Sequence, residues 1–357
     1  MGSDMGSDMG SDMGSDMGSD MGSDTERSAD GCTGRTLLVA STGGHLDELV
    51  RLAPRFSPCA SDVEWVTHPG PQADDLLRGR RVHLVPYVAP RDVRHAAVNL
   101  IPALRILRRG HWDRVVTTGA GVALPFVIVA RMLGSIPCVY VESATRLEGP
   151  SLTGSLLAHV PGVELCTQQP AWADERWLYR GSVFDGFEAQ HRPVASPARR
   201  VVVMLGTSPY AFRSAVDAVL RTLPQVSTSD VEVTWQVGGT EVDPQSLPAG
   251  ARVSASLPAA ELQARVAEAD LVIAHAGVGS ALTALGAGRR PVLLPRAASA
   301  GEHVDDHQSQ IAADLNARGL AVGVRPGDLT PEHLRTALAS RVESTQGNPF
   351  LLTPHAA

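Results

Sequence analysis

The stretch from Asp270 to Gln310 constrains the fold of this chain more than any other. Its two apolar runs, Leu271–Ala274 and Pro291–Pro295, are typical of buried parallel strands. Between them lie a glycine turn at 275–280 and a helix-forming segment. A strand that turns through glycines into a helix leaves backbone N–H groups at the helix N-terminus, where they can hold a phosphate. We therefore predict an open α/β sheet with a ligand at this edge.

The same alternation of strand and helix runs through both halves of the chain. Strands are expected at 36–40, 63–67, 82–85, 114–118, 137–141 and 162–166, and again at 200–205, 231–237, 252–255, 271–274, 291–295 and 320–324. Two such runs predict two doubly wound parallel sheets, each a Rossmann-like domain, that face each other across a cleft. The expected domains are 34–189 and 200–342, with a linker at 190–199 and a C-terminal tail at 343–357.

Residues 1–24 repeat the tetrapeptide Met-Gly-Ser-Asp. This segment is polar and too poor in apolar groups to pack, so we expect residues 1–33 to be a disordered tail. It lacks the apolar core of a secretion signal. Without the six aspartates of the repeat, the formal charge of −7 becomes −1. A body this close to neutral gives no indication of a nucleic-acid partner.

The basic residues and cysteines exclude several kinds of chemistry. All 31 residues counted as lysine or arginine are arginine. Sites that need a lysine, such as a Schiff base or a Walker-A phosphate loop, are therefore excluded. The four cysteines are widely spaced and form no Cys-x-x-Cys pair, so we expect buried thiols in a reducing cytosol, not a zinc site or a disulfide framework.

The first half carries its own candidate residues at strand ends. Thr42, Gly43 and Gly44 follow the first strand, and His45 then projects from the first turn of a helix. Taken by itself, such a histidine more often caps or lines a loop than reacts. Gly119 and Glu142 follow two later strands of the same sheet. A carboxylate at such a position is a site candidate, or else a helix cap or a partner for an arginine.

A basic amphipathic helix is predicted from Arg91 to Arg109. Such a helix can lie on an anionic membrane surface. The alternative, which we favour, is a helix that packs on the core through its apolar stripe and exposes its charged face.

Taken together, these motifs resemble those of a GT-B glycosyltransferase over residues 36–325. Ser41–His45 and Val141–Arg146 resemble the acceptor-side subunit of the eukaryotic two-subunit GlcNAc transferase of the dolichol pathway and its bacterial exopolysaccharide relatives. The second half resembles the donor-side subunit, so the chain looks like a fusion of the two. It is more distantly similar to the bacterial GlcNAc transferase of the lipid-linked peptidoglycan precursor. The donor-side motifs are Leu205-Gly206-Thr207, Gln236-Val237-Gly238, His275–Ser280 and Asp305–Gln308.

The resemblance implies an inverting transferase that moves a sugar, GlcNAc or a related hexose, from a UDP-sugar to a hydroxyl acceptor. We find no paired Asp motif of the kind that would hold Mg²⁺ or Mn²⁺, so we expect no metal, and we expect no cofactor. His45 would be the base that takes the acceptor's proton, with Glu142 as second choice or as a positioning group. Thr42, Gly43, Gly44 and Gly119 would form the acceptor-side loops. Arg296 and His303 are further candidate cations for a phosphate. The implied donor-binding residues are Gly206, Thr207, Gln236, Leu257, His275, Gly277, Val278, Gly279, Ser280, Thr283, His307 and Gln308.

One departure from the resembled pattern concerns the ribose. Relatives place an acidic residue eight positions after the motif histidine, and here that residue is Thr283. A hydroxyl cannot make the bidentate contact of a carboxylate, so the choice between UDP and dTDP stays open. The acceptor also stays open: a polyprenyl-linked sugar, a polysaccharide end or a small secondary metabolite. We expect a cytoplasmic protein, either free or peripheral at the inner membrane face. A UDP-GlcNAc 2-epimerase and a binding subunit without activity are the alternatives.

Overall fold

The computed structural model describes residues 34–57, 59–88, 97–134, 136–191, 197–302 and 307–352. The predicted N-terminal tail and His303 lie outside these residues. Within them, the chain from Cys32 onward forms one compact unit. No helix in the described part is long and apolar enough to cross a bilayer.

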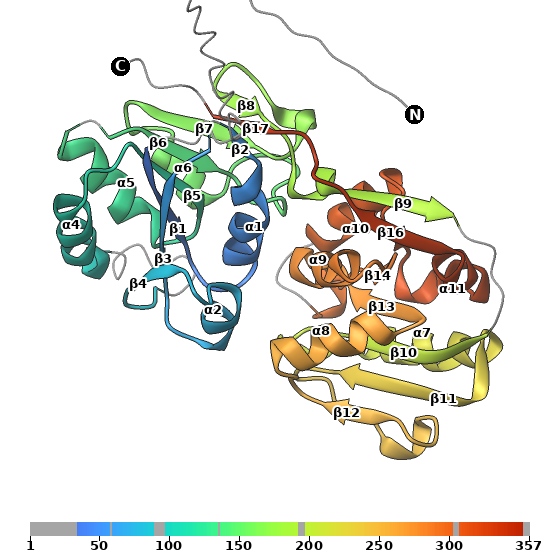
Figure 1. The fold of residues 1–357 in the computed structure, drawn as a ribbon. Coiled ribbons are helices and arrows are strands. Elements are labelled where there is room, and N and C mark those ends of the chain that lie inside the picture. The colour runs from blue at the N-terminus through green and yellow to red at the C-terminus, as the bar shows by residue number, and fades with distance from the viewer. Residues whose placement is uncertain are drawn as a thin grey trace, which may run out of the picture. The chain divides into compact units, whose positions relative to one another are not determined.

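The first half builds a seven-stranded sheet in the order β4-β3-β1-β5-β6-β7-β8, and every neighbouring pair is parallel. Its strands are β1 (Arg35–Ala40), β3 (Asp62–Thr67), β4 (Arg81–Leu84), β5 (Arg114–Gly119), β6 (Cys138–Val141), β7 (Val163–Thr167) and β8 (Trp177–Tyr179). Its helices are α1 (Gly44–Leu52), α2 (Pro71–Leu76), α4 (Leu100–Arg109), α5 (Ala123–Met132) and α6 (Leu152–Leu157). This sheet runs from blue to green in Figure 1. The short edge strand β8 was not predicted.

The second half builds a six-stranded parallel sheet in the order β12-β11-β10-β13-β14-β15. Its strands are β10 (Ala198–Met204), β11 (Ser227–Gln236), β12 (Arg252–Ser254), β13 (Leu271–His275), β14 (Val292–Leu294) and β15 (Val322–Gly323). Its helices are α7 (Arg213–Thr222), α8 (Ala259–Glu268), α9 (Val278–Gly286), α10 (His307–Ala317) and α11 (Pro331–Leu338). The prediction of two parallel α/β sheets is confirmed.

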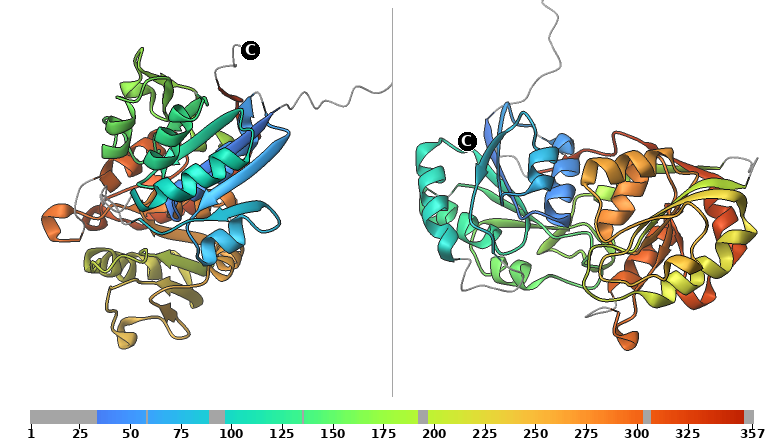
Figure 2. Two further views of the ribbon diagram at one scale, coloured as in Figure 1. Left: turned by 90° about the vertical axis from the view of Figure 1, so that its left-hand side faces the viewer. Right: turned by 90° about the horizontal axis from the view of Figure 1, so that it is seen from below.

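The C-terminal segment is not the separate tail that we expected from residue 343. Strand β16 (Ser340–Ser344) pairs antiparallel with β9 (Phe187–His191), the segment that leaves the first half. Strand β17 (Phe350–Leu351) then pairs with β2 (Phe56–Ser57) of the first half. Figures 1 and 2 show β9 and β16 side by side. The expected linker at 190–199 therefore overlaps β9 and β10, and its residues 192–196 lie outside the described part.

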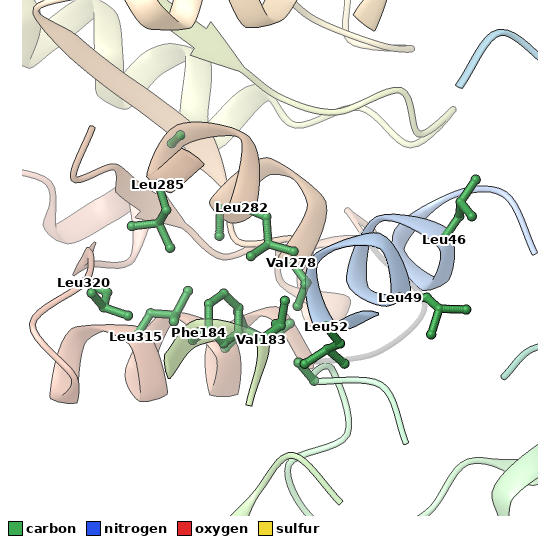
Figure 3. Close-up of a cluster of buried hydrophobic side chains, with 14 of the residues drawn as sticks. Leu46, Leu49, Leu52, Val183, Phe184, Val278, Leu282, Leu285, Leu315 and Leu320 are labelled. Atoms are coloured by element: carbon green, nitrogen blue, oxygen red, sulfur yellow. The ribbon is translucent and has the colours of Figure 1, made fainter. Parts of the chain in front are cut away.

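Helix α1 is anchored by an apolar face. Leu46, Leu49 and Leu52 are fully buried, and they belong to a core cluster that also contains Val278 and Leu282 of α9. Figure 3 shows this cluster. Burial of each leucine contributes about 1.5–3 kcal/mol. The packing fixes the N-terminal turn of α1, which carries the first-half candidate residues.

The cysteine expectation is correct for two residues and wrong for a third. Cys138 and Cys166 are buried free thiols. Burial raises the pKa of the Cys138 thiol to about 12. Cys59, by contrast, is disulfide-bonded.

Candidate active site

A cleft of about 820 Å³ brings loops of both sheets together. The loops that form it follow the carboxyl ends of β1, β10, β13 and β14, the edge at which open α/β sheets bind ligands. From the first half it is lined by Gly43, Gly44, Asp47, Arg51, Gln72, Asp75, Leu76 and Arg78. From the second half it is lined by Met204, Leu205, Gly206, Thr207, Ser208, Gln236, Ala259, Ala260, Leu262, Gln263, His275, Gly279, Ser280, Thr283, Arg296 and Gln308. The predicted donor and acceptor loops therefore share one cavity.

The N-terminus of α9 opens into this cleft. The helix begins at Val278 after the N-cap Gly277, and no side chain in the described part of the chain caps it. The first N–H groups of a helix have no partner within the helix and carry partial positive charge. Gly279 and Ser280 line the cleft, and a Cβ at Gly279 would meet nothing within 4 Å. A bound anion could therefore approach this backbone closely.

The imidazole of His275 packs against two glycines of the second half, Gly206 and Gly277. Its Nε2 is 2.9 Å from the Ser280 hydroxyl oxygen. A Cβ at Gly206 would lie 2.8 Å from the same Nε2, and a Cβ at Gly277 would also collide with the ring. Gly206 has φ +85°, a conformation that other residues rarely adopt. These two positions therefore need glycine because the histidine ring occupies the space of a side chain.

The Arg296 side chain binds the loop that follows β10. Its side chain is 1% exposed, and its guanidinium donates to the carbonyl oxygens of Leu205 (2.7 Å), Tyr210 (2.8 Å) and Glu302 (3.0 Å). It also lies over the Phe212 ring, 4.6 Å from the centroid. Burial lowers the pKa of this guanidinium. Arg296 is therefore a buried residue that uses its hydrogen-bond donors on the protein itself. These bonds hold the loop that follows β10.

The other predicted donor residues occupy different places. Gln236, Thr283 and Gln308 line the cleft. The Gln236 side chain accepts a hydrogen bond from the Leu257 N–H (3.1 Å), and Gln308 accepts one from Arg296 N–H (3.2 Å). The Thr283 hydroxyl donates to the Gly279 carbonyl (2.8 Å). His307 does not line the cleft, and its Nε2 accepts a hydrogen bond from Arg146 (2.8 Å).

On the first-half side, the glycine turn is held by a residue that the sequence did not single out. Gly43 N–H donates to the Gln72 side-chain oxygen (2.6 Å), and the Gln72 amide donates back to the Gly43 carbonyl (3.1 Å). Gln72 comes from α2 and lines the cleft with Gly43 and Gly44. Thr42 precedes this turn and is half-buried.

His45 lies in the first turn of α1 and is half-buried; it is not among the residues that line the cleft, although its neighbours Gly44 and Asp47 are. Its Nδ1 is 2.8 Å from the Thr118 carbonyl oxygen, and the Thr118 hydroxyl donates to the His45 carbonyl (2.7 Å). A carbonyl oxygen can only accept, so Nδ1 carries the proton and the neutral ring presents a lone pair at Nε2. This is the tautomer that a general base needs. Gly119, which follows Thr118, has φ +107°.

Glu142 is fully buried, and donors of the protein occupy both of its carboxylate oxygens. Oε1 accepts from the Tyr140 hydroxyl (2.9 Å) and Ser143 N–H (3.1 Å), and Oε2 accepts from Ser151 N–H (2.8 Å). Burial, and then the charge of Glu142, raise the pKa of Tyr140. Glu142 does not line the cleft. This arrangement fits the positioning role and the cap role better than that of a base.

Sequence reasoning also missed a second buried carboxylate, Glu48 of α1. It is 1% exposed and accepts hydrogen bonds from Ser143, Ala144 and Gln168. One signal could have found it: Glu48 stands three residues after His45 and four before Leu52, on the side of the helix that carries the apolar residues.

Part of the chain matches a known protein family. The glycosyltransferase family 28 C-terminal domain matches residues 200–348. A UDP-N-acetylglucosamine–N-acetylmuramyl-(pentapeptide) pyrophosphoryl-undecaprenol N-acetylglucosamine transferase of Xanthomonas euvesicatoria is 27% identical over 329 residues, covering 85% of this chain and 72% of that protein.

Two solved structures share the fold. The glycosyltransferase SnogD from Streptomyces nogalater is 23% identical, with a TM-score of 0.54 and coverage of 86% of this chain and 90% of that one. MurG of Acinetobacter baumannii is 20% identical, with a TM-score of 0.50 and coverage of 84% and 88%. The predicted GT-B class is confirmed. The chain is a GT-B glycosyltransferase distantly related to the peptidoglycan GlcNAc transferases, and its residues 200–348 match the glycosyltransferase family 28 C-terminal domain.

Proposed function

We propose that this enzyme transfers GlcNAc or a related hexose from a UDP-sugar to a hydroxyl acceptor, with inversion and without a metal. The observation that carries the proposal is the shared cleft, into which the N-terminus of α9 and the glycine turn before α1 both open. The Xanthomonas relative, which covers most of this chain, is named for transfer of N-acetylglucosamine from its UDP form.

In this proposal the diphosphate lies between the N-terminus of α9 and the loop from Gly206 to Ser208. The partial positive charge of the helix and the loop amides stabilise the negative charge that develops on the departing UDP. Gln236 and the segment around Leu257 flank the nucleoside. The Thr283 hydroxyl makes one hydrogen bond to the ribose, and Gln308 lies on the sugar side.

His45 is the proposed base. As the acceptor oxygen bonds to the anomeric carbon, the bond from that carbon to the diphosphate breaks and its electron pair leaves with UDP. The acceptor proton passes to Nε2 of His45, because Nδ1 is already committed to Thr118. Attack opposite the leaving group inverts the anomeric centre. Glu142 serves to order the loop after β6.

We further propose that the acceptor is lipid-linked or a polysaccharide end and that the enzyme meets it by peripheral membrane contact. Leu100 and Ile101 of α4 are 39% and 59% exposed, and Arg105, Arg108 and Arg109 are exposed on the same helix. Exposed apolar groups beside arginines suit an anionic membrane surface. Arg91 and the rest of the predicted basic segment before residue 97 lie outside the described part. Co-sedimentation with anionic but not neutral vesicles tests this contact.

The decisive experiment measures UDP release with UDP-GlcNAc, UDP-glucose and dTDP-glucose against a panel of lipid-linked, polysaccharide and small-molecule acceptors. We expect release that requires both donor and acceptor and that persists in EDTA. Mass spectrometry of the product gives its mass, and NMR gives its anomeric configuration. Formation of an epimer without any acceptor would assign the cleft to an isomerase. Donor binding without turnover on the whole panel would indicate a binding subunit.

A further inference from the structure

The structure buries a carboxylate, Glu48, on the same helix as the proposed base and one turn after it. Its Oε1 accepts from the Ser143 hydroxyl (2.7 Å). Its Oε2 accepts from Ala144 N–H (3.0 Å) and from the Gln168 side-chain amide (2.7 Å). Burying a carboxylate is costly unless its oxygens are bonded, and here three donors converge on it.

These donors come from the ends of two adjacent strands. Ser143 and Ala144 follow β6, and Gln168 follows β7, which pairs with β6. Gln168 also donates to the Glu142 carbonyl (3.0 Å) and accepts from Val183 N–H (2.7 Å). Glu48 therefore ties α1 to the carboxyl edge of the sheet at β6 and β7, while the hydrogen bonds between His45 and Thr118 tie the same helix to β5.

The charged groups around Glu48 indicate which residue its carboxylate acts on. Burial raises the pKa of the Glu48 carboxyl; the charge of His45 and the hydrogen bonds from Ser143, Ala144 and Gln168 oppose the rise. Tyr140 of β6 and Glu142, which follows β6, lie beside the cluster, and neither can carry positive charge. Asp47, also on α1, is paired with Arg51. Among the described residues, His45 is the basic group whose charge acts on Glu48.

Resting on the proposed role of His45 as base, we propose that Glu48 is its positioning residue. It fixes α1 so that His45 reaches the acceptor, and its carboxylate stabilises the imidazolium that forms when Nε2 takes the acceptor proton. The proton later leaves His45 for solvent, which restores the neutral ring without any further reactant. Glu48 touches neither sugar nor nucleotide.

The test is Glu48→Gln in the full chain. Glutamine has the same shape, and the Ser143 hydroxyl can rotate to accept from its NH₂ group while its oxygen accepts from Ala144 and Gln168. The substitution therefore removes the charge and keeps the contacts. We expect kcat to fall about tenfold or more, the factor that corresponds to the loss of about 1.4 kcal/mol of transition-state stabilisation. We expect KM for the UDP-sugar to stay constant. Because an uncompensated imidazolium is less favourable, the acidic limb of the kcat/KM profile moves to lower pH.

A second readout does not require turnover. NMR titration of the His45 imidazole, assigned with the His45→Ala variant, should show its midpoint at lower pH in Glu48→Gln than in the unmodified protein. An unchanged midpoint overturns the inference even if transferase activity is found. If no transferase activity is found, the titration still decides the coupling, so failure of the proposed function and failure of this inference are distinguishable.

Glu64→Gln is the matched control. Glu64 is 5% exposed and is paired with Arg35 and His83, away from the cleft-lining residues. The Glu64→Gln variant should have a lower stability and an unchanged pH profile of kcat/KM. If Glu48→Gln behaves like Glu64→Gln, with a lower melting temperature but unchanged kcat and pH profile, the role of Glu48 is structural only and the inference is wrong.

Discussion

The Nδ1 atom of His45 lies 2.8 Å from the carbonyl oxygen of Thr118. This contact joins the first turn of α1 to the end of β5, and it fixes which ring nitrogen carries the proton. The reciprocal bond from the Thr118 hydroxyl to the His45 carbonyl (2.7 Å) holds the backbone of the same residue. The ring is therefore oriented before any acceptor arrives, which favours proton transfer from a bound hydroxyl.

Replacing His45 with alanine should lower kcat by about 10²–10⁴-fold, the usual contribution of a general base. UDP affinity, measured by calorimetry, should stay unchanged because the donor-side groups come from the second half. His159→Ala is the control, since His159 is exposed and its ring Nδ1 lies 2.8 Å from the Ser155 carbonyl oxygen of its own helix end. Unchanged turnover in His45→Ala would remove this residue from the mechanism.

Replacing Gly206 with alanine should destabilise the protein and weaken UDP binding. The new Cβ would lie 2.8 Å from His275 Nε2 at a φ of +85°, so the loop or the His275 ring must shift. Gly319→Ala is matched for backbone conformation, with φ +72°, but its Cβ meets nothing within 4 Å. We expect Gly319→Ala to cost about 1–2 kcal/mol of stability without a change in UDP affinity. Equal UDP affinity in the two variants would contradict the close approach of this loop to the donor.

Replacing Arg296 with methionine should free the loop that follows β10. The carbonyl oxygens of Leu205 and Tyr210 would lose their donor, so the free energy of unfolding should fall by at least about 1–3 kcal/mol, the cost of one unsatisfied buried acceptor. UDP affinity should fall with it. Arg213→Met, on the exposed face of α7, should change stability by less than about 0.5 kcal/mol. Urea unfolding and calorimetry measure both effects; a stable Arg296→Met variant with full UDP affinity would argue against the role of Arg296.

Stability should fall as pH rises through the titration of Glu48. Burial raises the pKa of this carboxyl above its ordinary value of 4.5, so the folded state binds the proton more tightly than the unfolded state. Between 4.5 and the raised folded-state pKa, unfolding releases a proton, and the free energy of unfolding therefore decreases with pH. Asp47, whose pKa burial also raises, contributes with the same sign above 3.8.

Glu64 changes the pH dependence of stability with the opposite sign. Burial raises its pKa, but its contacts with Arg35 and His83 outweigh burial, so its pKa is lowered and its contribution to stability is lost as pH falls. Urea unfolding across pH 4–8 should show a shallower fall of stability with pH in Glu48→Gln than in the unmodified protein. The same dependence in both would mean that Glu48 does not titrate in this window.

Much of the fold was determined by local patterns in the sequence. The apolar run at 271–274 and the glycines after it formed β13 and the N-terminus of α9, because burial and backbone freedom act within a few residues. His45 could be placed at the mouth of the first sheet for the same reason, since it follows a strand and a glycine turn.

The tertiary structure decided what depends on distant neighbours. Strands β16 and β17 are short, and their pairing with β9 and β2 could not be read from their own residues. The partners of Arg296 and Glu48 could not be read from the sequence: both side chains are buried because carbonyl, hydroxyl and amide groups from remote segments converge on them. A charge becomes tolerable in an interior only when the folded chain supplies such partners, and that supply is a property of the whole fold.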